Sequence, residues 1–306
     1  MSDQNQKKIL LAYVALGVGI VCIGFSAIFV KIAAIPGPVS AFYRVLIAAI
    51  IVVPWGLFTQ GRHTRLSRKQ FILIAAGGIV FGLELALWNT SLLYTSAATS
   101  TLLANNASLW VGLGALWLFR EQLALRYWCG LLISLVGMAI LIGAASWHGF
   151  HLNFGDLLAI IASFLYAAYL LITQRAREGV GTLTFMAWSL IPSVLVLLIL
   201  NLAMGTALVG YSKKTWLALL GLGLFSHMLG WLALNYALGH LRAAPVSVSL
   251  LAQTVVTALA SIPILGESLS THQIVGGVIV LSGIYLANQR NRKPSASVSS
   301  KYASMR

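Results

Sequence analysis

The chain has 306 residues, of which 59% are apolar and only 8% are charged, and its formal net charge is +14. A soluble domain carries about a quarter charged residues, so this composition excludes an ordinary water-soluble fold and indicates a protein that lies in lipid. Strands of alternating polar and apolar residues are absent from the sequence, which argues against a transmembrane barrel.

Apolar stretches follow one another along the chain, and each is close to the roughly 20 residues that cross a bilayer as a helix. The first follows a polar amino end that carries Lys7 and Lys8. It is too long for the core of a signal peptide and has no clear cleavage site, so we expect an uncleaved span. In chain order, the predicted spans are 10–30, 38–59, 71–92, 97–118, 126–146, 155–174, 182–203, 214–237, 244–265 and 272–288.

The positions of the basic residues indicate how these spans are oriented. With the amino end in the cytoplasm, 16 Lys and Arg residues fall on the cytoplasmic side and only Lys31, Lys213 and Lys214 on the other side. This bias predicts a multi-pass protein of the cell membrane, or of the inner membrane in a bacterium, with both termini cytoplasmic. The basic loops are short and contain no recognisable binding module, which argues against nucleic acid as a partner.

The sequence matches itself without gaps at an offset of 146 residues. Because each half then holds five spans, the second half enters the membrane in the opposite orientation. The predicted fold is an all-α integral membrane protein of ten transmembrane helices in two inverted five-helix repeats, an architecture typical of secondary carriers. The aligned pairs include Asn89 with Asn235, Glu121 with Glu267, Gly130 with Gly276 and Gly137 with Gly283.

This repeat predicts how the chain is divided. We expect a cytoplasmic N-tail (1–9), a first five-helix repeat (10–146), a connecting outer loop (147–154), a second five-helix repeat (155–289) and a basic, disordered cytoplasmic C-tail (290–306) that touches anionic membrane lipid. The paired glycines are expected to let helices pack closely. Glu121 and Glu267 lie at helix ends, where we expect each to cap the next helix.

Two patterns that end the halves carry a family resemblance. FREQLALRYWCGLLISLVGMAIL and LGESLSTHQIVGGVIVLSGIYLA resemble the glutamate-then-glycine signature of EamA-type proteins in the drug/metabolite transporter superfamily. PGPVSAFYRVLIAAIIVVP resembles the second span of that family, with Arg44 at its arginine, and FGDLLAIIASFLYAAYLLITQR resembles the start of its second half. The resemblance implies export. One departure is that ANNASLW and AQTVVTA lack a proline common in the family, and we expect Asn105 and Asn106, or Gln253, to replace its bend.

Glu84 puts a carboxylate inside the third predicted span. At 1.5 Å per residue it lies about 10 Å from the outer edge of a roughly 30 Å hydrocarbon core, and Arg44 lies about 9 Å deep from the same side. A lone charge at that depth is costly, so one interpretation is a buried ion pair of Arg44 and Glu84. The alternatives give Glu84 a role in proton coupling or in binding a substrate amine, or leave it partly hydrated with no role in transport.

His227 lies opposite Phe81 in the repeat, one turn from the position of Glu84. It is either a proton carrier or a neutral buried histidine with a satisfied hydrogen bond. An inward group of aromatic and amide side chains would suit a small amphiphile, although asparagines also join helices to one another. The candidate substrate-binding or coupling residues are Glu84, His227, Trp88, Asn105, Asn106, Trp110, Trp231, Tyr236 and Gln253. Asn89 and Asn235 fit helix packing better.

The favoured function is a secondary transporter that exports small metabolites, such as amino acids or related amphiphiles, by alternating access along a gradient, with proton coupling left open. The alternative is a multidrug cation exporter, in which Glu84, Trp88 and Trp231 bind a lipophilic cation. A membrane acyltransferase is least favoured, because His151 and Asp156 have the HxxxxD spacing but no catalytic domain around them, and Asp156 better fits a helix cap.

We expect no enzyme activity. The sequence contains no nucleotide-phosphate loop, Walker motif or metal-ligand cluster, so we expect a substrate gradient or an ion gradient to drive transport. No cofactor or metal is expected for the same reason. The expected partners are a small-molecule substrate and membrane lipids, and formation of a homodimer stays open.

Overall fold

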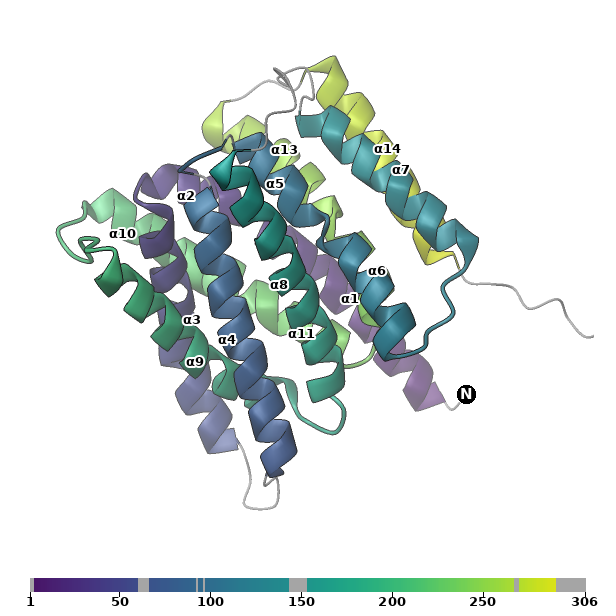
Figure 1. The fold of residues 1–306 in the computed structure, drawn as a ribbon, viewed down its shortest axis with the longest axis horizontal. Coiled ribbons are helices and arrows are strands. Elements are labelled where there is room, and N and C mark those ends of the chain that lie inside the picture. The colour runs from purple at the N-terminus through teal and green to yellow at the C-terminus, as the bar shows by residue number, and fades with distance from the viewer. Residues whose placement is uncertain are drawn as a thin grey trace, which may run out of the picture.

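The computed structural model describes residues 3–59, 66–91, 93–95, 97–142, 153–266 and 270–289. Every regular element within these ranges is a helix (Figure 1). The first half contains α1 (Asp3–Gly24), α2 (Ser26–Ala33), α3 (Gly37–Thr59), α4 (Arg68–Ser91), α5 (Ala97–Asn105), α6 (Ala107–Leu118) and α7 (Leu125–Ile142). The second half contains α8 (Phe154–Ala176), α9 (Thr182–Ala203), α10 (Lys213–Leu220), the π-helix η2 (Gly221–Leu229), α11 (Gly230–Leu238), α12 (Ala243–Leu250), α13 (Ala252–Leu265) and α14 (Thr271–Asn288).

These elements form five helical segments in each half. Single-residue breaks separate α1 from α2, α5 from α6 and α12 from α13, while α10, η2 and α11 follow one another without a gap. Eight of the described helical stretches are long and apolar enough to cross a membrane. The predicted all-helical fold of two five-helix repeats is therefore confirmed. α1 begins at Asp3 and so extends into the region 1–9 that we expected to be a tail.

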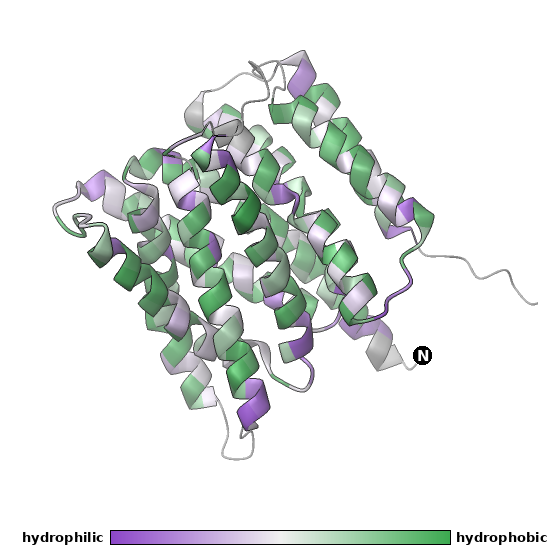
Figure 2. Ribbon diagram, viewed as in Figure 1, coloured by the Kyte–Doolittle hydropathy of each residue, from purple (hydrophilic) through white to green (hydrophobic). Residues whose placement is uncertain are grey.

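The outer surface of the bundle is apolar. Figure 2 shows hydrophobic residues along the outward faces of the helices, with hydrophilic residues gathered near several helix ends. Large side chains such as Phe58 (88% exposed), Trp117 (84%) and Leu125 (78%) point away from the protein. Water would disfavour so extensive an apolar surface, whereas lipid favours it, as expected of a multi-pass membrane protein.

The helix bounds follow the sequence repeat. The offset of 146 residues carries α7 onto α14 residue for residue, and the first residue of α5 onto the first of α12. The two halves also interlock, because α3 packs against α9, α4 against α8, and α1 against α11 (Figure 1). The contact of α4 with α8 and the contact of α11 with α1 are equivalent under the offset. Reciprocal contacts of this kind are what two inverted repeats predict.

Helices α7 and α14 lie side by side and contact each other through glycine backbones (Figure 1). A Cβ atom on Gly130 would lie 2.5 Å from the carbonyl oxygen of Gly283, and one on Gly137 would lie 2.9 Å from that of Gly276. Real Cβ atoms essentially never come within 3.0 Å of such a neighbour. The predicted close-packing role of the paired glycines is therefore confirmed.

The breaks in the fourth segment of each half are single tightened turns. At the first, the N–H of Asn106 donates to the carbonyl of Leu103 (3.2 Å), and at the second the N–H of Leu251 donates to that of Val248 (3.1 Å). Both hydrogen bonds span three residues instead of the four of an α-helix, which is the 3₁₀ pattern. The expected bend is thus present at Asn106 without a proline, whereas Gln253 lies two residues beyond the second bend.

Asp156 caps α8, as expected. Its N–H donates to Oδ1 of Asn153 (2.9 Å) while its Oδ2 accepts from the N–H of Asn153 (3.0 Å), which makes a reciprocal capping box. The other carboxylate oxygen, Oδ1, accepts a hydrogen bond from the hydroxyl of Thr95 (2.6 Å). Asp156 therefore joins the start of the second half to the connection between α4 and α5.

The expectation that Glu121 caps the next helix was wrong. Glu121 lies four residues before the first residue of α7, too far from the N–H groups of its first turn. Its Oε1 instead accepts from Nε2 of Gln174 (3.3 Å) on α8, and its Oε2 lies 3.9 Å from Nη1 of Arg242. Glu121 thus joins the first half to the second. Its repeat partner Glu267 lies outside the described residues.

Candidate functional site

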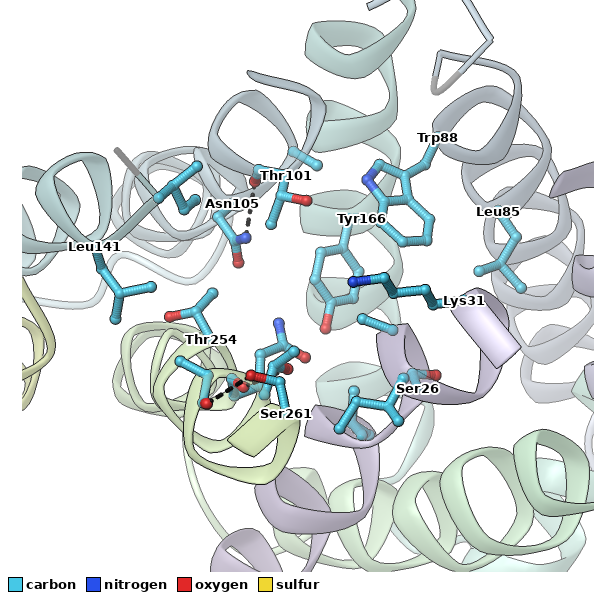
Figure 3. Close-up of a pocket in the computed structure, with 18 of the residues that line it drawn as sticks. Ser26, Lys31, Leu85, Trp88, Thr101, Asn105, Leu141, Tyr166, Thr254 and Ser261 are labelled. Carbon is cyan, nitrogen blue, oxygen red and sulfur yellow. Dashed lines mark hydrogen bonds between the residues drawn. The ribbon is translucent and has the colours of Figure 1, made fainter. Parts of the chain in front are cut away.

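A cavity of about 390 Å³ lies between the two halves. Its walls come from α1 to α5 and α7 of the first half and from α8, α11, α13 and α14 of the second. It reaches the end of the bundle at which α2 and α7 finish and α14 begins, because Lys31, Ile142 and Gln273 line it. We call that end the mouth of the cavity. Figure 3 shows Lys31 among the other side chains that line the cavity.

Arg44 and Glu84 line the cavity near its inner end. Their side chains are almost fully buried, at 4% and 7% exposed. They are close enough to interact electrostatically, but within the described chain no nitrogen of Arg44 lies within 4.0 Å of a carboxylate oxygen of Glu84. Nε of Arg44 has no hydrogen-bond partner among the described residues. Both charges are therefore placed to receive a group from inside the cavity.

Three aromatic side chains form much of the wall beside these charges, namely Trp88, Tyr166 and Trp231. In Figure 3, Trp88 and Tyr166 point from two different helices into the space that Lys31 also enters. The ring of Trp231 packs edge-to-face against that of Tyr166, with ring centroids 6.2 Å apart. An apolar wall next to buried charges is the usual composition of a site for a small amphiphilic molecule.

His227 lies on η2, behind this wall and not among the residues that line the cavity. It is fully buried, with its ring 5.7 Å from that of Phe81 and 5.9 Å from that of Trp231. Neither ring nitrogen has a partner within the described part of the chain, so the expected satisfied hydrogen bond is not formed. A π-helix often occurs at functional positions, but here it places His227 one layer away from the cavity.

Two amide side chains, Asn105 on α5 and Gln253 on α13, line the cavity. Nδ2 of Asn105 donates to the carbonyl of Thr101 (2.8 Å), one turn earlier on the same helix (Figure 3). That bond fixes the amide and leaves its oxygen for a donor in the cavity. Both residues are therefore suited to orient the polar end of a substrate.

Other predicted residues lie elsewhere. Nε1 of Trp110 donates to Oγ of Ser163 (2.9 Å), and its ring stacks on Phe164 with centroids 4.0 Å apart, so it joins α6 to α8. Tyr236 packs on His240, with ring centroids 4.4 Å apart, near the end of α11. Asn106 occupies the turn between α5 and α6. None of these three predicted residues lines the cavity.

The asparagine pair differs in its contacts. Asn235 joins helices, since its Oδ1 accepts from the hydroxyl of Tyr169 on α8 (3.2 Å). Nδ2 of Asn89 donates to the carbonyl of Leu85 within its own helix (2.7 Å). Both side chains are buried at 1% exposed, but only Asn235 forms the interhelical hydrogen bond expected of both.

Several cavity residues were not predicted from the sequence, among them Lys31, Tyr166, Thr101, Thr254 and Ser261. A tyrosine hydroxyl in the middle of an apolar span was a usable signal for Tyr166. Lys31 looked like an interfacial residue, and serine and threonine are too common in spans to stand out. In the described chain, no group of three His, Cys, Asp or Glu side chains is placed to hold a metal ion.

Arg177, at the end of α8 away from the mouth, is also buried, at 7% exposed. Nε donates to the carbonyl of Asn235 (3.1 Å), Nη2 to Oγ1 of Thr182 (2.6 Å) and Nη1 to the carbonyl of Val180. Burial lowers the pKa of the Arg177 guanidinium to about 10, so it stays charged near neutral pH. These contacts hold the ends of α8 and α11 together.

Comparison with known proteins adds a family and a fold. The family model described as the EamA-like transporter family matches residues 10–143 and 153–289. An uncharacterized transporter of Archaeoglobus fulgidus is 26% identical over 260 residues, covering 83% of this chain and 88% of the relative. A probable amino-acid metabolite efflux pump of Salmonella typhimurium is 26% identical over 282 residues, covering 78% and 93%. A solved crystal structure shares the fold, with TM-score 0.76 at 18% identity, covering 92% and 96%.

Proposed function

The chain belongs to the EamA-like transporter family, and from this premise we propose that it is a secondary transporter that exports small metabolites by alternating access. The observation that carries the proposal is the cavity between the two halves, which is lined by Arg44 and Glu84 without a direct ion pair between them. Carriers built from inverted repeats bind their substrates between the halves. The name of the Salmonella typhimurium relative supports amino acids or related metabolites as the substrate class.

The side chains of the cavity support a zwitterion with an apolar body. The planar guanidinium of Arg44 suits a carboxylate, to which it can donate two parallel hydrogen bonds. The carboxylate of Glu84 suits an ammonium group, or a proton that exchanges with it during transport. Trp88, Tyr166 and Trp231 offer an apolar wall for the rest of the molecule.

The charge bias of the sequence supports cytoplasmic termini, and the mouth of the cavity then opens to the outside. Lys31, which lies at the mouth, is one of the three basic residues assigned to that side. In this orientation the structure corresponds to the state that releases substrate outside. Export requires the reverse state, in which the same cavity opens to the cytoplasm.

A multidrug cation exporter has support from one observation, the aromatic wall beside Glu84, because aromatic faces attract cations. The guanidinium of Arg44 in the same cavity repels such a ligand, so we rank this function second. The acyltransferase alternative loses support, since the carboxylate of Asp156 is occupied by the cap of α8 and by Thr95. His151 lies outside the described residues.

The experiment that tests the proposal uses the purified protein in lipid vesicles loaded with a mixture of amino acids and small amphiphiles. Mass spectrometry of the external medium, with and without a pH gradient, reports which compounds leave. Selective efflux that depends on the protein supports a metabolite exporter, and dependence on the gradient supports proton coupling. Efflux of lipophilic cations alone would favour the second function, and no selective efflux at all would contradict both.

Trp88 and Trp110 allow a paired prediction about substrate binding. Trp88→Leu is expected to raise the substrate concentration for half-maximal transport about tenfold, because losing about 1.4 kcal/mol of aromatic contact changes binding by that factor. Its thermal stability should change little, since Trp88 faces the cavity. Concentration-dependent efflux from vesicles measures the first quantity, and thermal unfolding of the purified variant measures the second.

Trp110→Leu is the matched control. It removes the hydrogen bond to Ser163 and the stack on Phe164, so it should lower stability by about 1 kcal/mol or more while leaving the half-maximal concentration unchanged. Equal effects of both substitutions on substrate binding would contradict the assignment of Trp88 to the substrate site.

A further inference from the structure

Lys31 and Arg177 are equivalent residues, because the offset of 146 carries one onto the other. Lys31 lies in the last turn of α2, and Arg177 directly follows α8, so each ends the first helical segment of its half. The residue whose carbonyl accepts a hydrogen bond from Arg177 also has an equivalent, since the offset carries Asn89 onto Asn235. The chain thus has a cation and an asparagine at both ends of the bundle, whereas Glu84 has a glycine, Gly230, as its equivalent.

The two cations are in opposite situations. Arg177 is buried and donates to the carbonyl of Asn235 at the end of α11. Its guanidinium also lies against Gly239, where a Cβ atom would be only 2.9 Å from Cζ of Arg177. No residue of this cluster lines the cavity, so this end of the bundle is sealed. Lys31 is exposed and lines the mouth of the cavity (Figure 3).

The acceptor that corresponds to the carbonyl of Asn235 is already turned toward the chain that follows Lys31. A Cβ atom on Gly37, the first residue of α3, would lie 2.8 Å from the carbonyl oxygen of Asn89. At the sealed end, the start of α9 occupies the equivalent place beside α11, and Thr182 there accepts from Arg177. The acceptor and the adjoining start of a helix that form the seal at Arg177 therefore have counterparts at the mouth, where Lys31 lines the cavity.

We propose that Arg177 and Lys31 are paired gate residues, of which Arg177 holds the end away from the mouth shut, while Lys31 binds the carbonyl of Asn89 when the mouth closes. This inference rests on the proposed alternating access, in which two inverted halves exchange conformations. The contacts that Arg177 makes in this structure then predict the contacts that Lys31 makes in the other state, in which the mouth is closed. Removing either residue should favour the state in which its own end is open.

Access to a single cysteine tests this proposal without any substrate. Thr254 lines the cavity from α13, so Thr254→Cys in a Cys22→Ala, Cys129→Ala background places one reporter thiol there. A membrane-impermeant thiol reagent is applied to right-side-out and to inverted vesicles. The face from which the otherwise unchanged protein is labelled faster identifies the mouth side, and the ratio of the two labelling rates reports the balance between the two states.

Arg177→Ala is expected to lower the ratio of mouth-side to opposite-side labelling at least about tenfold, which corresponds to a shift of about 1.4 kcal/mol between the states. Lys31→Ala is expected to raise the same ratio. Arg177→Lys and Lys31→Arg, which keep the charge, should stay close to the parent protein. Should Arg177→Ala fail to fold, Arg177→Gln, which keeps N–H donors without the charge, should lower the ratio in the same direction.

Shifts of the ratio in the same direction for both residues, or no shift for either, would overturn the proposal. The outcome is distinct from that of the export experiment. Opposite shifts of the labelling ratio would support the gate residues even if the protein exported none of the tested compounds. Export of amino acids without opposite shifts would support the proposed function and contradict the gate residues.

Discussion

Glu84→Gln is expected to abolish the response of export to a pH gradient and to slow export at least about tenfold, since a loss of 1.4 kcal/mol is already a factor of ten. Glutamine keeps the shape of the side chain but removes its charge and its ability to release a proton. Glu84 is 7% exposed and lines the cavity next to Arg44, so its carboxylate is placed to act on a group inside the cavity. Efflux from vesicles with and without the gradient measures both effects.

Glu178→Gln is the matched control, because Glu178 pairs with Arg175 at 2.7 Å while both side chains are more than half exposed. Exposed pairs contribute little to stability, so this substitution should change neither the rate nor the response to pH. Retention of the gradient response in Glu84→Gln would contradict a role in proton coupling. Export by the double variant, Glu84→Gln with Arg44→Gln, separates the two roles of Glu84. If Arg44→Gln restores the export rate that Glu84→Gln lowers, the two residues form a structural pair.

Gly276→Ala is expected to lower the free energy of unfolding by about 1–3 kcal/mol or more, because the added methyl group overpacks a closed interface. It would lie 2.6 Å from Cα of Leu141 and 2.7 Å from the carbonyl oxygen of Gly137. Both neighbours are backbone atoms, which cannot rotate away. Thermal unfolding of the purified protein, followed by the fraction that remains monodisperse, measures the effect.

The neighbouring glycine on the same helix is the control. A Cβ on Gly277 would lie 3.7 Å from both Cδ1 of Leu141 and Cγ1 of Val255, which is ordinary van der Waals contact. Gly277→Ala should therefore stay within about 0.5 kcal/mol of the parent protein or stabilise it slightly, since alanine favours helix. Similar losses for both variants would contradict the assignment of this interface to Gly276.

The fold was largely predictable because lipid imposes a simple rule on sequence. Apolar length located the helical segments, and the offset of 146 residues identified the glycines of α7 and α14 as equivalent positions where helices pack closely. The break at Phe25 was not predicted, although Gly24 precedes it, and the second bend lies at Leu251, two residues before Gln253. The π-helix η2 was missed because hydropathy does not distinguish a π-helix from an α-helix.

The sequence predicted how deep in the membrane each candidate residue lies, but not toward which side of its helix the side chain points. Counting residues from the membrane edge placed Arg44 and Glu84 at the same level, and both line the cavity. The same counting could not show that Trp110 turns toward Ser163 on α8, because the bend at Asn106 changes which face of the segment points inward. Glu121 has its partner Gln174 more than 50 residues away in the sequence, beyond any local helix-end rule.

The glycine contact between α7 and α14 bears on the proposed exchange of conformations between the two halves. The offset carries Gly130 onto Gly276 and Gly137 onto Gly283. The contact of Gly130 with Gly283 is therefore equivalent to the contact of Gly276 with Gly137, and both lie between the same two helices. The contact between α7 and α14 therefore maps onto itself when the two halves exchange places, as does the contact between α3 and α9. In the alternating access proposed above, α7 and α14 can thus keep their glycine contacts in both states, and their tight packing does not oppose the exchange.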